Sequence, residues 1–181
     1  MRNAKKITTP LSDESIRGLA VGDRVLITGI VYTARDAAHK RLFEIMQSGG
    51  SMPFDFAGQI VYYAGPSPAR PGAAIGSIGP TTSGRMDSYS PALIRLGLKA
   101  MIGKGLRDDE VKRAIVEHCG VYFAAVGGAG ALISRSVRRA DVIAFPELGT
   151  EAIRRLEVED FPAVVAIDSS GNDIYATSDY R

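Results

Sequence analysis

Short apolar runs alternate with segments of helical periodicity along most of the chain, and this alternation restricts the fold more than any other feature. Residues 24–33 form a β-branched run that is typical of a strand. The next segment, residues 34–46, places apolar side chains at positions 38, 42, 45 and 46, which is the spacing of one helix face. The same reasoning predicts strands at 59–63, 73–78, 99–102, 121–126 and 142–145, and helices at 12–19, 91–98, 149–156 and after Asp108.

Ser12, Ser90 and Asp108 are the expected helix N-caps, because their short polar side chains can accept from free backbone N–H groups. A closing hairpin is expected from 163–168 and 173–176 around the turn at 169–172. Strands thus interleave with helices while β-rich segments open and close the chain. This order favours an α/β fold, a mixed domain of stacked layers, over a purely doubly wound sheet.

The composition is that of a globular protein with no unusual charge. The length of 181 residues suits a single domain, residues 1–181, with 45% apolar and 23% charged residues. A net charge of +2 with interspersed signs lacks the basic patch of a nucleic-acid-binding protein. No apolar run reaches the roughly 20 residues that span a bilayer, and the basic N-terminus lacks the apolar core of a signal peptide. We therefore expect a cytoplasmic protein.

Cys119 is the only cysteine, and His39 and His118 are the only histidines. A single thiol cannot close a disulfide within the chain or hold an iron–sulfur cluster or a structural zinc alone. The sequence therefore predicts no metal ligands in this chain, and any such cofactor must come from another polypeptide. His118 and Cys119 continue the helical spacing that follows Asp108, so we expect them to face the core and not to act in catalysis.

The loop at residues 79–87, GPTTSGRMD, concentrates residues that a solvent-facing connection rarely needs together. Glycines 79 and 84 permit backbone angles that are closed to other residues. Three hydroxyl residues at 81–83 precede Arg85, whose planar fork suits a carboxylate or phosphate. We interpret the loop as an anion-binding cradle, with a glycine-bounded turn of solvated hydroxyls as the alternative.

Familiar motifs do not account for this loop. Its glycine spacing is that of a P-loop, but Arg-Met stands where Lys-Ser or Lys-Thr is required. The Gly-Ala-Gly at 128–130 begins like a dinucleotide fingerprint, yet Ile133 occupies the third glycine position. The Gly-x-Ser-x-Gly elbow and the zincin pattern are absent from the sequence.

Two further cations stand at the ends of predicted elements. Arg35 begins the helix at 34–46, where the positive helix end disfavours an arginine unless an anion joins it; Asp36 could supply that compensation instead. Lys104 lies between two glycines after a strand, either as a ligand group or as a solvated lysine. Together with Arg85 and the hydroxyls, these cations suit a small dicarboxylate. A general base of suitable pKa is not evident among them.

Taken together, these segments resemble the C-terminal domain, or separate β subunit, of class I fumarate hydratases and of the related L-tartrate dehydratases. The resemblance rests on YTARDAAH at 32–39, GPTTSGRMD at 79–87, IGKG at 102–105, VGGA at 126–129, ELGTEA at 147–152 and FP at 161–162. These blocks occur in order over nearly the whole chain. Thr150 departs from the pattern, since a methionine is expected there.

The resemblance implies a swivelling β/β/α domain with a mixed sheet that closes over a cluster-bearing partner. In that family a [4Fe-4S] cluster is held by three cysteines of the α portion, so the cluster here would belong to a separate α subunit, with α2β2 as the expected assembly. Arg35, Arg85 and Lys104 would bind the substrate carboxylates and Thr81 would lie at the reacting carbon. Four further residues would support them from behind: Asp36, His39, Thr82 and Asp87.

The implied activity is that of a hydro-lyase, the reversible hydration of fumarate to (S)-malate. An L-tartrate dehydratase or a mesaconate hydratase β subunit is the alternative within the family, because these substrates differ from malate by a hydroxyl or a methyl group. A non-catalytic dicarboxylate-binding regulatory module is the alternative from another functional class.

Overall fold

A computed structural model describes residues 4–125 and 129–176 of the chain. Its strands are β1 (Lys5–Thr8), β2 (Arg24–Thr33), β3 (Ile60–Tyr62), β4 (Ala100–Gly103), β5 (Val121–Ala124), β6 (Val137–Ala144) and β7 (Ile153–Ile167). Its helices are α1 (Asp13–Arg17), α2 (Asp36–Gln47), α3 (Ser90–Arg95), α4 (Asp109–Glu117) and α5 (Gly130–Ile133), with short 3-10 helices η1 (Ser83–Met86), η2 (Ser134–Ser136) and η3 (Pro146–Glu151). The content is mixed α/β, as the sequence predicted.

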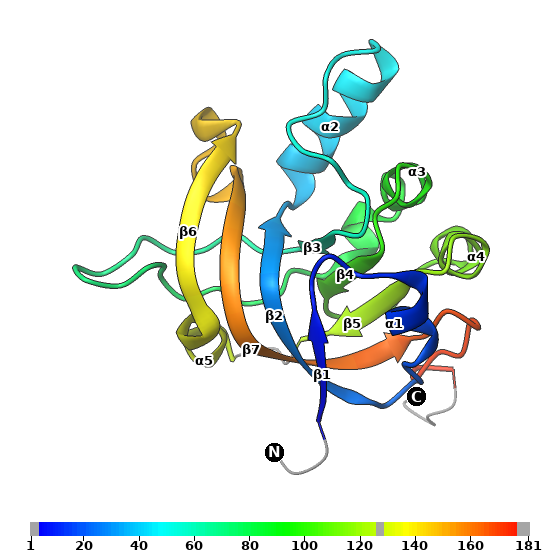
Figure 1. The fold of residues 1–181 in the computed structure, drawn as a ribbon. Coiled ribbons are helices and arrows are strands. Elements are labelled where there is room, and N and C mark those ends of the chain that lie inside the picture. The colour runs from blue at the N-terminus through cyan, green and yellow to red at the C-terminus, as the bar shows by residue number, and fades with distance from the viewer. Residues whose placement is uncertain (1–3, 126–128, 177–181) are drawn as a thin grey trace.

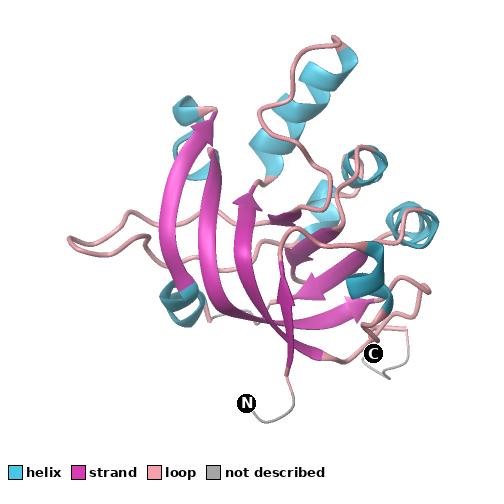
Figure 2. Ribbon diagram, viewed as in Figure 1, coloured by secondary structure: helices cyan, strands magenta, loops and turns pink. Residues whose placement is uncertain are grey.

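The strands form one mixed sheet in the order β1-β2-β3-β4-β5-β7-β6 (Figure 2). Neighbours from β1 to β5 pair in parallel, whereas β7 pairs antiparallel with β5 and β6. The long strand β7 also pairs antiparallel with β2 over most of the length of β2. Strands β2, β3, β4, β5 and β7 therefore close into a ring, while β1 and β6 pair outside it (Figure 1).

Alternation along the ring strands creates two apolar cores. Ile60 and Tyr62 of β3 belong to a core shared with β2 and β7, in which the Tyr62 and Phe161 rings meet edge to face at 5.3 Å. Val61 and Tyr63 point the opposite way, into a core shared with α2, α3 and α4. Since neighbouring strand residues face opposite sides, a strand buried on both sides is apolar at every position. This explains the continuous apolar runs in the sequence.

Two of the three predicted N-caps are confirmed. The Ser12 side chain accepts from the Ser15 N–H in a reciprocal capping box, and the Asp108 side chain accepts from the Val111 N–H. Ser90 is not a cap, because α3 begins at Ser90 itself with Tyr89 before it. The Ser90 hydroxyl instead donates to the Met86 carbonyl inside the protein.

The helix predicted at 149–156 is wrong, since η3 ends at Glu151 and β7 begins at Ile153. The start of β7 lies between β2 and β6, and pairing on both edges overrides its local helical spacing. Residues 73–78 form no strand; the loop that contains them is joined by a Ser67 N–H to Ser77 carbonyl bond.

The C-terminal part of the chain also differs from prediction in its details. Strand β6 begins at Val137, earlier than the predicted 142–145. The expected closing hairpin is reduced to a turn on Asp168 and a single Ile167–Asp173 bridge. Positions 126–128, which include the end of the strand predicted at 121–126 and most of the VGGA block, lie outside the described residues. Over the described ranges, no helix has the length and apolar character needed to cross a bilayer.

Candidate functional site

The predicted site residues follow the carboxyl ends of adjacent parallel strands. Arg35 and Asp36 follow β2 after Ala34, and Lys104 comes directly after β4. Strand β3 lies between these two strands, and just beyond its end Ala64 pairs with Pro80 in an isolated bridge. The carboxyl ends of parallel strands meet at one edge of a sheet, where α/β proteins commonly bind ligands. The fold therefore brings three sequence-distant segments to one edge.

Asp36 joins two of the predicted cations. Its Oδ1 lies 2.7 Å from Arg85 Nε, and its Oδ2 lies 3.3 Å from Arg35 Nε. Arg85 is in η1, so this carboxylate links the loop at 79–87 to the start of α2. The Arg35 side chain is 25% exposed and that of Arg85 is 54% exposed. Asp36 thus supplies the compensation that the sequence left open as the alternative explanation for Arg35.

Backbone hydrogen bonds place Thr81 beside Lys104. The Thr81 N–H donates to the Tyr63 carbonyl at 2.7 Å, and the Lys104 N–H donates to the Thr81 carbonyl at 3.3 Å. Thr82 forms a parallel bridge with Lys104 and is exposed. The half-buried Thr81 and the exposed Lys104 are therefore next to each other at the end of β4.

Ser83 does not belong with these hydroxyls. It is buried, and its Oγ lies 2.9 Å from the Tyr122 hydroxyl, which donates to the Gly105 carbonyl. A Cβ built on Gly103 would collide with this Oγ, so Ser83 packs directly on the end of β4. The predicted hydroxyl cluster is reduced to Thr81 and Thr82.

The glycines of the loop are not used as expected. Among the described residues, neither Gly79 nor Gly84 is found at positive φ, and Gly84 has ordinary room for a Cβ, with its nearest contact at 3.8 Å. Gly130 is the tight position instead, since a Cβ there would lie 2.9 Å from the Gly79 nitrogen. Close packing therefore accounts for Gly130, whereas neither packing nor an unusual backbone angle requires a glycine at position 84.

Asp87 supports the loop through a buried arginine that sequence reasoning did not select. Asp87 Oδ1 accepts from Arg107 Nε at 2.7 Å, and Oδ2 accepts from the Asp108 N–H at 2.8 Å. The Arg107 side chain is fully buried, and its guanidinium lies over the Tyr63 and Tyr122 rings. A buried charge needs such partners, so Arg107 is a structural cation behind the loop.

His39 lies on the inner face of α2 and is buried beneath Tyr63, whose ring is 5.2 Å away. Burial lowers the pKa of His39 to about 4, so the ring is neutral at pH 7. In the neutral ring Nδ1–H donates to the Arg35 carbonyl at 3.1 Å, the tautomer that this contact assigns. Nε2 has no hydrogen-bond partner within the described part of the chain. His39 therefore contacts the backbone of Arg35 from behind.

Glu151 completes the surroundings of Arg35, and sequence reasoning missed it. Its Oε1 lies 3.4 Å from Arg35 Nε, and its Oε2 accepts from the Ala37 N–H at 2.8 Å. The preceding residue is Thr150, the position that departs from the family pattern. The only sequence signal for a role of Glu151 was its position within the ELGTEA block. Nothing in the neighbouring sequence indicates that the end of η3 contacts the start of α2.

In the part of the chain that the structure covers, no group of three or more His, Cys, Asp or Glu side chains is placed to hold a metal ion. Cys119 is partly buried against the apolar core, and its Sγ lies 3.8 Å from the Asp13 carbonyl. His118 is half-buried at the end of α4. Neither residue lies on the elements that carry the candidate site.

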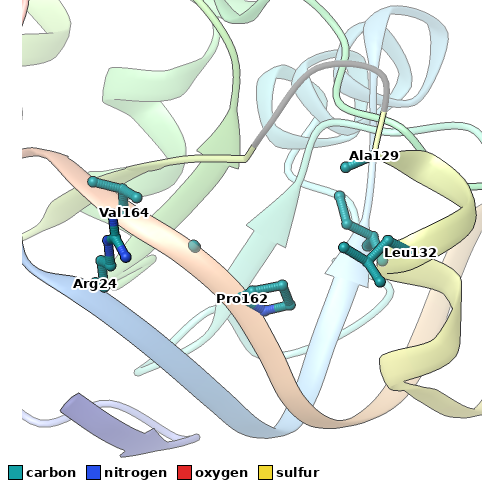
Figure 3. Close-up of a pocket in the computed structure, with 7 residues that line it drawn as sticks. Arg24, Ala129, Leu132, Pro162 and Val164 are labelled. Atoms are coloured by element: carbon teal, nitrogen blue, oxygen red, sulfur yellow. The ribbon is translucent and has the colours of Figure 1, made fainter. Parts of the chain in front are cut away.

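A separate hollow of about 310 Å³ lies between α5 and the β2–β7 pair (Figure 3). It is lined by Ala129, Leu132, Ile133 and residues 162–164, with Arg24 as its single charged side chain. An apolar hollow with one cation lacks the convergent polar groups that fix a small polar ligand. The strand-end cluster of Arg35, Thr81, Arg85 and Lys104 remains the candidate site.

The sequence matches the model of the Fumarase C-terminus family over residues 2–178. The chain belongs to this family. Fumarate hydratase 2 of Leishmania major is 42% identical over 158 residues, which is 86% of this chain and 28% of that protein. The anaerobic class I fumarate hydratase of Escherichia coli K12 is 41% identical over 157 residues, or 86% of this chain and 29% of the enzyme.

A shorter relative matches along most of its own length. It is a Methanocaldococcus jannaschii chain provisionally named as the beta subunit of an L(+)-tartrate dehydratase, 42% identical over 171 residues, with 91% of this chain and 88% of that one covered. This member of the fumarase C-terminal family thus spans under a third of those two fumarate hydratases but nearly all of the separate subunit.

Proposed function

We propose that the chain is the β subunit of a two-subunit, [4Fe-4S]-dependent hydro-lyase that reversibly hydrates fumarate to (S)-malate. The observation that carries this proposal is the arrangement at neighbouring strand ends in a fumarase C-terminal family member, where Asp36 pairs with both Arg35 and Arg85 and the Lys104 N–H donates to the Thr81 carbonyl. The match to a relative named as a beta subunit, over 88% of its length, supports a two-subunit enzyme with an α partner.

The three cations suit the two ends of a dicarboxylate. The ion pairs with Asp36 use Nε of both arginines, which leaves the terminal nitrogen edge of each fork to bind a carboxylate. Partly exposed ion pairs of this kind contribute about 0–1 kcal/mol. Asp36 can therefore orient Arg35 and Arg85 without holding them so tightly that a substrate carboxylate cannot compete.

The chain's own residues do not fit an iron–sulfur cluster, since Cys119 is its single cysteine and lies away from the site. We therefore assign the cluster to an α subunit with three cysteine ligands. When bound, the cluster would supply a Lewis-acidic iron that polarises the substrate hydroxyl and one carboxylate.

The proposed catalytic roles of this chain are the stabilisation of negative charge and the transfer of a proton. Arg35, Arg85 and Lys104 would stabilise the negative charge that develops on the carboxylate as the C3 proton leaves, a preorganised electrostatic role. Thr81 would lie at the reacting carbon, beside Lys104. A threonine hydroxyl is a weak base near pH 7 and needs an activating neighbour, for which we propose an aspartate of the α subunit.

A hydro-lyase of the same family that acts on a different substrate is the second candidate function. The Methanocaldococcus relative favours an L-tartrate dehydratase β subunit, and mesaconate is the methylated analogue of the proposed substrate. We further propose a cytoplasmic α2β2 enzyme in which this chain acts as a swivelling β/β/α domain that closes over the cluster-bearing subunit.

The test is anaerobic reconstitution with the candidate α subunit, iron and sulfide. Fumarate, malate and mesaconate are then assayed by the appearance or loss of the conjugated double bond, and L-tartrate is assayed by formation of the 2-oxo acid to which its enol product tautomerises. Faster turnover of fumarate or malate than of L-tartrate or mesaconate supports the proposal. Faster turnover of L-tartrate or of mesaconate supports the corresponding alternative activity instead. A loaded pair that is inert toward all four refutes the hydro-lyase assignment.

A further inference from the structure

Glu151 has no part in the reaction proposed above, yet it contacts both the side chain and the helix end on which that reaction depends. One oxygen lies 3.4 Å from Arg35 Nε, and the other accepts from the Ala37 N–H at 2.8 Å. Glu151 ends η3, so a single carboxylate joins the β6–β7 connection to the first turn of α2. Its side chain is 24% exposed, which shields the pair from most of the solvent.

Arg35 is confined on its other sides as well. Asp36 lies 3.3 Å from the same Nε atom. The backbone of Gly65 packs on the arginine, because a Cβ built there would lie 3.3 Å from Arg35 Cδ. The same Cβ would lie 2.9 Å from the carbonyl oxygen of Thr150, the residue just before Glu151. The start of α2, the segment after β3 and the end of η3 therefore interlock around one guanidinium.

We infer that Glu151 is a positioning residue, which holds Arg35 by Nε so that its terminal nitrogens face the substrate carboxylate. The inference rests on the proposed function. A bidentate contact depends on the angle of the planar fork, so a fixed guanidinium binds better than a mobile one. Glu151 also brings a negative charge close to the site of a dianionic substrate, which by itself opposes binding.

These two effects of Glu151 have opposite signs, and this makes the inference testable. Glu151→Gln keeps an oxygen that can accept from the Ala37 N–H but removes the charge that faces Arg35. If Glu151 only caps α2, removing its charge should leave dicarboxylate affinity unchanged or improve it. If Glu151 positions Arg35, affinity should fall although a repulsive charge has been removed.

The experiment uses the reconstituted two-subunit enzyme, with succinate as a saturated dicarboxylate that competes with the substrate. For Glu151→Gln we expect the succinate inhibition constant and KM to rise about tenfold, with a smaller change in kcat. Glu147→Gln is the matched control, because Glu147 lies in the same 3-10 helix but pairs with Arg41 at the surface. It should retain wild-type constants. Thermal unfolding checks that the variants are folded.

Glu151→Asp gives a second test that does not depend on the glutamine variant. It keeps the charge but is one methylene shorter, so it cannot reach both Arg35 and the Ala37 N–H. Positioning predicts weaker succinate binding, whereas a purely electrostatic role predicts no change. In an Arg35→Met background, Glu151→Gln should have no further effect, because Glu151 acts through Arg35.

Each outcome bears on one of the two proposals. Unchanged or tighter succinate binding in both Glu151 variants, or additive effects with Arg35→Met, overturns the positioning role while the active wild-type enzyme keeps the proposed function. A loaded wild-type pair that is inert toward every substrate overturns the proposed function, and the role of Glu151 in it falls as well.

Discussion

At the scale of single residues, the carboxylate of Asp36 orients the guanidinium groups of two arginines. Asp36 contacts Nε of both Arg35 and Arg85, so each fork is oriented from behind. This arrangement differs from a surface ion pair, because a second carboxylate, Glu151, also contacts Arg35. Both arginines are therefore held in place by carboxylates, as the proposed binding of a substrate anion requires, and are not simply solvated.

Replacing Arg85 tests this preparation directly. If Arg85 stabilises the transition state, Arg85→Ala should reduce kcat/KM of the reconstituted enzyme by about 100-fold or more, at roughly 1.4 kcal/mol per tenfold. Arg95→Ala is the control, since among the described residues Arg95 forms only an exposed 4.0 Å pair with Glu110. Steady-state kinetics measures both. Near-wild-type kinetics for Arg85→Ala would remove Arg85 from the site.

His39 predicts a pH dependence of stability. Its pKa is lowered by burial from 6.5 to about 4, so the unfolded chain binds more protons than the folded one between these values. The free energy of unfolding therefore rises with pH in this window, and the contribution is complete above about pH 6.5. Between pH 7 and 5.5 we expect His39 alone to account for a loss of about 1 kcal/mol.

Urea unfolding at these two pH values measures the effect. His39→Gln should flatten the dependence, because the amide does not titrate while it can still donate to the Arg35 carbonyl. His118→Gln keeps His39 and serves as the control. An equal pH dependence in His39→Gln and wild type would show that His39 does not shift on folding.

At the scale of elements, the packing of η1 on the end of β4 places the loop at 79–87. The Ser83 hydroxyl occupies the space where a side chain on Gly103 would lie. Gly103→Ala should therefore push η1 away from Lys104 and cost about 1–3 kcal/mol of folding free energy. Gly84→Ala should stay within about 0.5 kcal/mol, because its site has ordinary room.

Thermal or urea unfolding compares these two variants, and the activity of the folded Gly103→Ala protein should also fall because Thr81 and Lys104 are displaced from each other. Equal stability of the two alanine variants would contradict the packing argument. The comparison also separates the two explanations for glycine in this region, since only close packing makes Gly103 more sensitive than Gly84.

At the scale of the whole molecule, the proposed site is half of an enzyme. The chain provides cations and a hydroxyl but only one cysteine, so the isolated chain should be inactive and should bind malate weakly, with Kd above about 1 mM. Isothermal titration calorimetry with malate, and succinate for comparison, measures this. Tight and specific malate binding by the isolated chain would favour a dicarboxylate-binding regulatory module.

Most of the elements could be predicted from local sequence because their apolar spacing agrees with their final environment. Ala38 and Leu42 of the predicted stripe on α2 are buried in the core while Ile45 and Met46 are half-buried, and Asp108 does cap α4. The segment at 149–156 failed because its conformation is decided by distant partners, β2 and β6, and not by its own spacing. Arg107 was missed for a related reason, since its burial depends on Asp87, Tyr63 and Tyr122.

The sequence by itself determined the alternation of strands and helices, the family and the residue types of the site, since these depend on spacing and chemical identity along the chain. Tertiary structure alone decided that Asp36 bridges two arginines, that Glu151 returns to α2, and that Ser83 is buried under β4 and not exposed beside Thr81. The physical reason is that the contacts of Asp36 with Arg85, of Glu151 with Ala37 and of Ser83 with Tyr122 join residues far apart in sequence. Their distances are set by the closure of the strand ring and by nothing local.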